Sequence, residues 1–559
     1  MIAALLLAPL WAADHEGVLA ASSVSTTDDV KLRYYRDRTT LPDFPGYNHL
    51  FDYFELVNRL NLVADAERWQ AGTQADVLAI LGGYYYLDDQ RVNELALHGE
   101  GVDFPLPLAY ANLEKIWFTG RFGQGNELQV GDGYTAFGRG LALNLVRNTD
   151  IDVDTSLRGA QLILGGSRWD LKVLSGFTNP QQILQDNPNV QLRPDRTHLI
   201  NGARANLYGA GPANLGAHVV TYTFSRELSE GQSSLARFEQ PLDAVVGGAS
   251  VELLGLLRGD WFVEGDAFGY RSGDLFRDGE AKPGYAVYGS TAYYPGRLAI
   301  LVEGKRTVNT ERLNAFTSAE GYEVASGPTL EYERVITEDS SAAVNSDDLW
   351  GGRVRVDIAA NPGVMTPYVS VAAFRDEELG GLHFNRSPET IVHPMVGMDW
   401  LAEDIHVLVN AGFRQDIRDP GGNGEDYGAD SMAHADLSFG FLAGPIHGEL
   451  DGSFQQFWWG ENQNQQHDFT VVSVAAAGHM PHDVTVVLYG DYSNDPLIDS
   501  VGNISDSVYG AAEVQVQPFE GATVKAFYGA YRAGIRCAGG QCRKLPGFEG
   551  ARLSASFVF

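Results

Sequence analysis

The sequence ends with Gly550-Ala-Arg-Leu-Ser-Ala-Ser-Phe-Val-Phe559, and this stretch decides the fold. In an extended strand its side chains would alternate between two faces. The apolar face would carry Leu553, Ala555, Phe557 and Phe559. The polar face would carry Arg552, Ser554 and Ser556, with Val558 as its apolar exception. A period of two with one apolar and one polar face predicts a half-buried β-strand.

A chain that ends inside such a strand, on an aromatic residue, resembles a bacterial outer-membrane β-barrel, whose assembly machinery reads a C-terminal aromatic strand. The alternative is a soluble sandwich whose last strand ends in Phe559. The alternation recurs at 353–358, 433–441, 446–455 and 513–517. There the polar face often carries charges of both signs, as a water-filled lumen requires, and this favours the barrel.

Turn-forming residues divide the connections between strands into two classes. The short connections lie at 123–126, 165–167, 211–214, 256–259, 295–297, 361–363, 402–404, 443–445, 481–483 and 519–521. Longer polar connections alternate with them, as at 226–241, 309–349, 376–389, 414–431 and 533–549. Outer-membrane barrels have short turns on the periplasmic side and long loops outside. We therefore expect a bacterial outer-membrane protein with its C-terminus on the periplasmic side.

The short turns and the last strand account for all but the first strands of an even-numbered barrel. A strand at 73–81 would give about 22 strands, and strands at 54–64 and 30–35 would raise the number to about 24. We predict an all-β protein, a single transmembrane antiparallel β-barrel of about 22–24 strands over residues 51–559. Residues 1–13 are expected to be a signal peptide. Residues 14–50 would then be an N-terminal periplasmic or luminal segment.

The formal net charge of -32 leaves no excess of Lys and Arg to offset phosphate repulsion, so nucleic acid is not expected as a partner. No run of about 18 apolar residues is present to form a membrane helix. The expected partners are outer-membrane lipid and lipopolysaccharide, the barrel-assembly machinery, and periplasmic or surface proteins. No cofactor is expected, although acidic extracellular loops are candidates for Ca²⁺.

A glycine-rich stretch at 131–147 departs from the strand pattern. Glycines inside strands often mark a bend or a close approach of two backbones. One interpretation is a glycine-rich strand end, and the other is a segment folded into the lumen as a constriction. The constriction candidates are Gly131, Asp132, Tyr134, Phe137 and Arg139.

This stretch also carries a family resemblance. Gly131-Asp132-Gly133-Tyr134, then Phe137-Gly138-Arg139-Gly140, then Asp154-Thr-Ser-Leu-Arg-Gly-Ala160, resembles an uncharacterised family of outer-membrane barrels. The resemblance implies the compartment and the fold, but that family has no settled activity. A similarity of architecture alone extends to alginate-export-type barrels, which conduct an anionic polysaccharide.

Two strands joined by the short turn at 443–445 would bring imidazoles and carboxylates together on the lumen wall. These lumen-lining candidates are His434, Asp436, His447, Glu449 and Asp451. Imidazole and carboxylate together can bind a metal or move a proton. Lumen walls carry such residues without any site, so we expect no metal site.

Arginines on inward positions are candidates for basic rungs that attract anions. The lumen-lining candidates of this kind are Arg204, Arg353 and Arg355, with Arg552 elsewhere on the wall. The acidic net charge of the chain argues against a lumen that attracts anions. The sign of any ion selectivity therefore stays open.

Two sequences in the long connections have their own chemistry. Residues 416–426 contain several oxygen ligands and glycines, but their spacing differs from the EF-hand loop, so a plain solvated turn is the alternative to a Ca²⁺ loop. Cys537 and Cys542 bracket four residues in the last long connection. A redox C-x-x-C motif has two intervening residues, and an oxidising compartment favours a disulfide between Cys537 and Cys542.

We expect no enzyme, because the sequence contains no H-E-x-x-H, G-x-S-x-G or P-loop motif. A lumen or loop hydrolase with scattered catalytic residues is the alternative. The expected function is a channel-type barrel that passes hydrophilic solutes or a polymer. A plugged barrel that acts as a surface scaffold or as a secretion or assembly partner is the second candidate.

The fold prediction has a direct test in detergent-extracted protein. Circular dichroism should show a β-sheet spectrum, and the unheated protein should migrate faster than the boiled protein in a denaturing gel because the closed barrel resists unfolding. A helical spectrum, or full solubility without detergent, would contradict the barrel.

Overall fold

The computed structural model describes sixteen stretches of the chain. These are residues 23–36, 53–81, 108–123, 125–148, 152–183, 198–223, 241–272, 283–310, 349–377, 389–418, 429–458, 468–494, 508–532, 534–538, 541–545 and 548–559. The expected signal peptide at 1–13 lies outside them. No helix of the described stretches is long and apolar enough to cross a membrane.

Strands make up almost all of the described chain. In order they are β1 (Ser23–Tyr35), β2 (Tyr53–Ala66), β3 (Trp69–Leu81), β4 (Leu108–Phe122), β5 (Asn126–Gly133), β6 (Thr135–Phe137), β7 (Leu143–Leu145), β8 (Arg147–Asn148), β9 (Val153–Gly165), β10 (Trp169–Pro180), β11 (Leu199–Ala210), β12 (Ala213–Thr223), β13 (Pro241–Leu256), β14 (Gly259–Ser272), β15 (Gly284–Tyr293), β16 (Leu298–Val308), β17 (Leu349–Ile358), β18 (Met365–Asp376), β19 (Glu389–Leu401), β20 (Ile405–Arg418), β21 (Ala429–Ala443), β22 (Ile446–Trp458), β23 (Phe469–Met480), β24 (Val484–Ser493), β25 (Val508–Phe519), β26 (Ala522–Tyr531), β27 (Gly534–Ala538), β28 (Gln541–Leu545) and β29 (Phe548–Val558).

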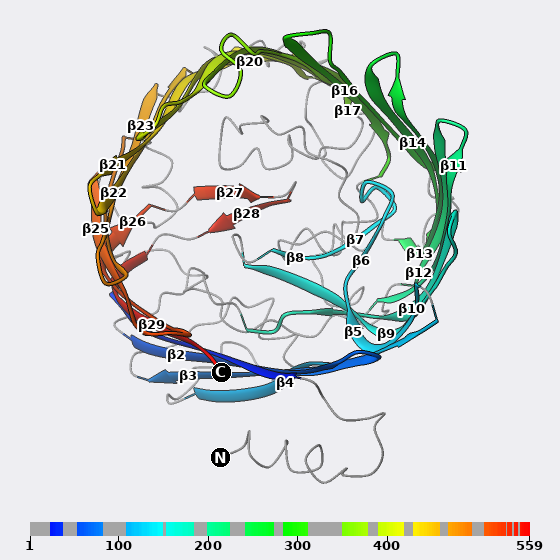
Figure 1. Ribbon diagram of the computed structural model, residues 1–559, viewed down its shortest axis with the longest axis horizontal. Coiled ribbons are helices and arrows are strands. Elements are labelled where there is room, and N and C mark those ends of the chain that lie inside the picture. The colour runs from blue at the N-terminus through cyan, green and yellow to red at the C-terminus, as the bar shows by residue number, and fades with distance from the viewer. Residues whose placement is uncertain are drawn as a thin grey trace.

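Within the described chain, 24 of these strands form one closed antiparallel barrel. Each strand pairs with its neighbours in chain order, and β1 pairs with both β2 and β29 to close the ring (Figure 1). The short strand β8 pairs on to β9, and β6 and β7 pair with each other. The prediction of a single all-β antiparallel barrel of about 22–24 strands is confirmed, and the described number is 24.

The outer surface of the barrel is apolar. Exposed aliphatic side chains come from strands all around the ring, among them Leu113, Val173, Val219, Val263, Val354, Val396, Leu488 and Leu553. Exposed outward aromatics flank this band at the short-turn end, where they are Phe122, Trp169, Trp261, Phe441 and Phe559. A second set lies at the opposite end and comprises Phe54, Phe177, Tyr285, Trp350, Phe413, Trp458, Tyr492 and Tyr528. An apolar band between two aromatic girdles is the surface that a lipid bilayer requires.

The connections follow the expected asymmetry. All the predicted short turns lie between consecutive strands, and one further short turn joins β2 to β3. The predicted start of the barrel at residue 51 was wrong, because β1 lies within 14–50 and supplies the closing strand. The alternation of apolar and polar residues in β1 is hard to recognise in the sequence. Asp28 and Asp29 are adjacent, so one aspartate falls on each face of the strand.

The hairpin of β27 and β28 contains both cysteines. Cys537 and Cys542 are direct cross-strand partners in its register. The Cα atoms of such partners lie about 4.5–5.5 Å apart, within the range that a disulfide spans. The disulfide itself stays a prediction.

Mass spectrometry can test the disulfide. Protein denatured without reductant should take up no iodoacetamide, and after reduction it should take up two equivalents, one for each cysteine. Alkylation of unreduced protein at both positions would show that the thiols are free.

Candidate functional site in the lumen

Strand β5 ends early, and the chain after it turns into the lumen. Residues 134–148, here called the inward segment, connect β5 to β9 and include β6, β7 and β8. They lie inside the ring in Figure 1. Gly131 permits the departure, because its φ of +98° favours glycine and a Cβ there would lie 2.1 Å from the Ile116 carbonyl oxygen.

The inward segment covers an apolar part of the inner wall. Its fully or almost fully buried side chains are Phe137, Leu141, Ala142, Leu143 and Leu145. They pack against lumen-facing residues of β9 to β14, here called the apolar wall, which are Leu157, Leu174, Ile200, Val220, Tyr222, Ala244, Val246 and Phe268. Burial of such side chains contributes about 1.5–3 kcal/mol for each large one. The hydrophobic effect therefore holds the segment on the wall.

A tight turn brings the segment onto β14. The Gly140 N–H donates to the Phe137 carbonyl at 3.1 Å, and the Arg139 N–H donates to Glu264 Oε2 at 2.7 Å. Gly138 has a φ of +59°, and a Cβ there would overlap the Glu264 carboxylate. The Arg139 guanidinium lies over the Phe262 ring at 4.5 Å. The glycine–x–glycine step is thus a docking turn.

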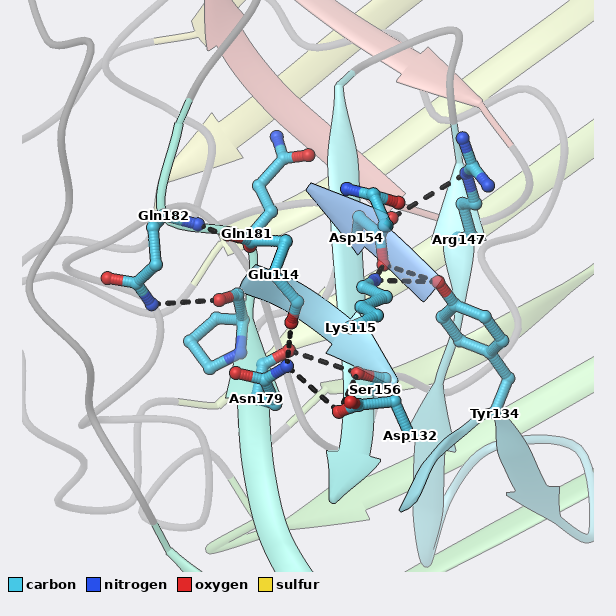
Figure 2. A network of polar contacts seen from close by, with 12 residues as sticks. Glu114, Lys115, Asp132, Tyr134, Arg147, Asp154, Ser156, Asn179, Gln181 and Gln182 are labelled. Atoms are coloured by element: carbon cyan, nitrogen blue, oxygen red, sulfur yellow. Dashed lines mark hydrogen bonds and ion pairs between the residues drawn. The ribbon is translucent and has the colours of Figure 1, made fainter. Parts of the chain in front are cut away.

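Polar residues anchor both ends of the segment (Figure 2). Lys115 forms a buried ion pair with Asp154, and its Nζ also donates to Tyr134 Oη at 2.7 Å. The Tyr134 hydroxyl donates to Asp154 Oδ1 at 2.7 Å, and Arg147 lies 3.6 Å from Asp154. The segment therefore leaves and returns beside one buried carboxylate.

A β-bulge in β4 supplies the lysine. Gln74 pairs with Lys115 and Ala75 pairs with Leu113, so Glu114 is the extra residue. The bulge buries Glu114 and Lys115 together, although successive residues of a regular strand point to opposite faces. Two neighbouring charged residues of β4 can then both place their side chains inside the barrel.

Side chains also seal the gap that β5 leaves between β4 and β9. Asp132 Oδ2 accepts the Ile116 N–H at 2.8 Å. The Glu114 carbonyl accepts from Arg158 Nη2 at 2.7 Å and from Asn179 Nδ2 at 2.8 Å. Backbone groups that have no neighbouring strand are satisfied in this way, as a membrane environment demands.

A second short run of chain follows β10 along the inner wall. Gln181 donates to the Asp152 carbonyl and carboxylate at 2.9 and 2.8 Å, and its Oε1 lies 3.5 Å from Arg59 Nη2. Ile183 is fully buried in the cluster that contains Val57. Residues 181–183 therefore link β10 to the inner face of β2.

The described residues on the other side of the ring border a cavity. A cavity of about 970 Å³ lies between β20–β26, β29 and β1. Its ionisable lining residues are Asp29, Lys31, Asp436, Asp451, Asp491, Glu513, Lys525, Arg532 and Arg552. The described inner wall thus has an apolar part covered by the inward segment and a charged part that borders the cavity.

The predicted constriction residues have different positions. Phe137 is buried on the apolar wall, and Tyr134 belongs to the polar anchor. Arg139 and Gly131 shape the two turns, and Asp132 seals the wall. The structure brings all five to the inward segment or its root, while their role in narrowing the pore stays a prediction.

The predicted arginine rungs are paired with acids. Arg204 lies 3.3 Å from Asp170, Arg353 is paired with Glu303, and Arg355 lies 2.7 Å from Asp357. Arg552 likewise lies 3.2 Å from Glu513. These four arginines therefore do not form an uncompensated basic ladder.

The predicted imidazole and carboxylate candidates form two groups rather than one. His434 is buried, and its Nε2 lies 2.8 Å from His393 Nε2, with Asp436 at 3.6 Å from its Nδ1. His447 and Glu449 lie nearer the short-turn end. Asp451 lines the cavity together with Asp436 of the first group. For the Ca²⁺ candidate, residues 419–428 lie outside the described chain, and Asp416 is held by Arg414.

Sequence reasoning missed the anchors of the inward segment. Lys115, Asp154 and Glu264 lie in three separate strands, and their pairing depends on the bulge and on the docking turn. A usable signal existed for the apolar wall. Val219-Val220 and Val245-Val246 place apolar residues on both faces of a strand, which a water-lined barrel strand does not need.

No protein-family model and no curated protein sequence matches the chain. Among solved structures, the siderophore receptor PirA from Pseudomonas aeruginosa aligns over 96% of this chain and 80% of that chain, at 8% identity and a TM-score of 0.47. The P pilus usher PapC translocation pore aligns over 96% and 99%, at 7% identity and 0.41. OccK3 (OpdO) of Pseudomonas aeruginosa aligns over 85% and 97%, at 11% identity and 0.35. These values are too low for any activity to be carried over.

The buried ion pair should dominate the stability of the anchor. Both side chains of the Lys115–Asp154 pair are less than 5% exposed. Lys115→Met should lower the free energy of unfolding by about 3–5 kcal/mol because Asp154 is left as an unpaired buried charge, and adding Asp154→Leu should recover much of that loss. Urea titration of the barrel in lipid vesicles would measure it.

The Arg121–Asp65 pair provides the matched control. It lies at 3.5 Å with side chains 42% and 41% exposed, so Arg121→Met should cost less than about 1 kcal/mol. Equal losses of unfolding free energy in Lys115→Met and Arg121→Met would show that the buried Lys115–Asp154 pair contributes no more to stability than an exposed pair.

Proposed function

We propose that this protein is a channel-type barrel of the bacterial outer membrane that passes hydrophilic solutes or a polymer, with its C-terminus on the periplasmic side. The single observation that carries the proposal is the division of the lumen. One part is covered by the inward segment, and the other holds a cavity of about 970 Å³ with charged walls.

The width of the barrel explains why a segment that narrows the lumen would be needed. Barrels of more than about 16 strands enclose enough space for a water-filled channel, and the largest are plugged. An unobstructed barrel of 24 strands would pass small solutes without selection. A segment held on one side of the wall narrows the passage and leaves the charged side for transport.

The charged side sets the chemistry of the cargo. Its lining carries both acids and bases, and Arg552 and Glu513 neutralise each other at 3.2 Å. Alternating charges hydrate a passage and favour polar solutes over apolar ones. An uncharged or zwitterionic hydrophilic solute fits this lining better than a strongly anionic polymer.

The second candidate function is a plugged barrel that serves as a surface scaffold or as a secretion or assembly partner. The observation that favours it is the strength of the anchor, since a buried ion pair at Asp154 and an apolar dock at Phe137 hold the segment at two points. In that case the wild-type protein, with the segment in place, would conduct little.

Planar-bilayer conductance tests the channel. Replacement of residues 137–146 by a short Gly-Ser linker should raise single-channel conductance on the order of twofold or more, because the covered part of the lumen becomes free for ions. Unchanged conductance in a folded, heat-modifiable barrel would contradict the constriction, and absence of conductance in the wild type would favour the scaffold.

A point variant tests the same idea without deletion. Gly138→Ala should weaken docking and increase conductance or its fluctuation, because a Cβ would overlap Glu264. Gly211→Ala is the matched control, since Gly211 has a similar φ of +71° in a short turn, and no atom of the described residues lies within 4 Å of the added Cβ. The control should conduct as the wild type does.

A further inference from the structure

Two imidazoles and one carboxylate converge on the lumen wall outside the segment described above. His447 Nε2 lies 3.5 Å from Glu449 Oε1, and His479 Nε2 lies 3.7 Å from Glu449 Oε2. The two imidazole rings stack at 5.1 Å between centroids. One ligand atom from each of the three lies within 4.8 Å of the others.

The strand register creates this arrangement. His447 and Glu449 are two residues apart on β22 and therefore share a face. His479 on β23 is the direct cross-strand partner of His447. Asp451, the next residue on that face of β22, lines the open cavity, so the face belongs to the lumen.

The spacing is that of metal ligands rather than of hydrogen bonds. Distances of 3.5 and 3.7 Å are longer than ordinary N–H···O bonds. Zn²⁺ binds imidazole nitrogen at about 2.0–2.1 Å and carboxylate oxygen at about 2.0–2.2 Å in a tetrahedron, which places neighbouring ligand atoms about 3.3–3.5 Å apart. Small side-chain movements would bring the three groups to one ion.

An outer hydrogen bond prepares His479 for this role. Its Nδ1 lies 2.9 Å from Thr485 Oγ1. If the Nδ1–H is donated to that hydroxyl, Nε2 keeps its lone pair, and no group in the described part of the chain forms a hydrogen bond with the shielded Nε2. Metal-binding histidines almost always have their second nitrogen held in this way.

The neighbouring strand leaves space beside the ligands. Gly440 on β21 is the cross-strand partner of Glu449. A Cβ on Gly440 would lie 3.7 Å from His447 Nε2 and 3.9 Å from His406 Cβ. The side chains of His447, Glu449 and His479 are 40–44% exposed, so an ion there could take a fourth ligand from the lumen.

We propose that His447, Glu449 and His479 form a binding site for a divalent transition-metal ion, with Zn²⁺ as the best fit, on the lumen wall near the short-turn end. Imidazole ligands favour Zn²⁺ and related ions over Mg²⁺ and Ca²⁺, which prefer oxygen. Three protein ligands with one open position make the ion exchangeable with the lumen. The site does not depend on the protein being a channel.

A second trio, His218, Glu264 and Asp266, is buried beneath the docking turn. His218 Nε2 and Asp266 Oδ1 are already hydrogen-bonded at 2.5 Å. All three side chains of this trio are buried. The His218→Asn variant removes a possible ligand of this trio and none of the proposed site, so it distinguishes the two.

Co²⁺ and Zn²⁺ binding to detergent-solubilised, tag-free protein test the proposal. Wild type should bind one Co²⁺ with the visible absorption of tetrahedral coordination, and Zn²⁺ should displace it in calorimetry. His447→Ala and His479→Ala should each weaken Zn²⁺ binding by at least about tenfold, and Thr485→Val by about tenfold through loss of the outer hydrogen bond.

Two variants serve as matched controls. Asp451→Asn removes one negative charge from the same face and should leave the affinity unchanged, as should His218→Asn. Heat-modifiable migration confirms that each variant is folded. Equal loss of affinity in Asp451→Asn and His447→Ala would show that the ion is attracted only by the general charge of the lumen. Loss of affinity in His218→Asn alone would show that the ion binds to the buried trio. Either result overturns the proposal.

Discussion

Every backbone N–H and C=O in a membrane barrel needs a partner within the wall, because lipid supplies none. The early end of β5 at Gly133 interrupts this rule between β4 and β9. Asp132, Arg158 and Asn179 restore it with hydrogen bonds to the backbone of residues 114 and 116. Only because this repair is made can the chain leave the wall and enter the lumen.

The repaired gap and the bulge in β4 together hold the inward segment in place. The bulge buries Glu114 and Lys115 together, and Lys115 then meets Asp154 where β9 begins. The inward segment starts and ends beside this pair, and its middle lies on the apolar wall. Charge fixes the two ends of the segment, and the hydrophobic effect fixes its centre.

The sequence was sufficient for the barrel because its evidence is periodic. The alternation at residues 353–358 and in the last strand, together with the short turns, fixed the strands and their faces. Composition around Phe137 indicated that residues 131–147 are unusual, yet the partners of that segment depend on contacts distant in sequence. Lys115 and Glu264 look like ordinary lumen residues until the bulge and the Gly138 turn give them their partners.

The two parts of the lumen also differ in their dependence on ring closure. The inward segment joins adjacent strands and docks on the strands that follow it, so its contacts span shorter stretches of chain than the pairing of the first strand with the last. The open cavity is lined by β1 and β29, whose pairing joins opposite ends of the chain. Local contacts form with a smaller loss of chain entropy than distant ones. The covered part can therefore assemble while the sheet is still open, whereas the cavity exists only once the first and last strands have met.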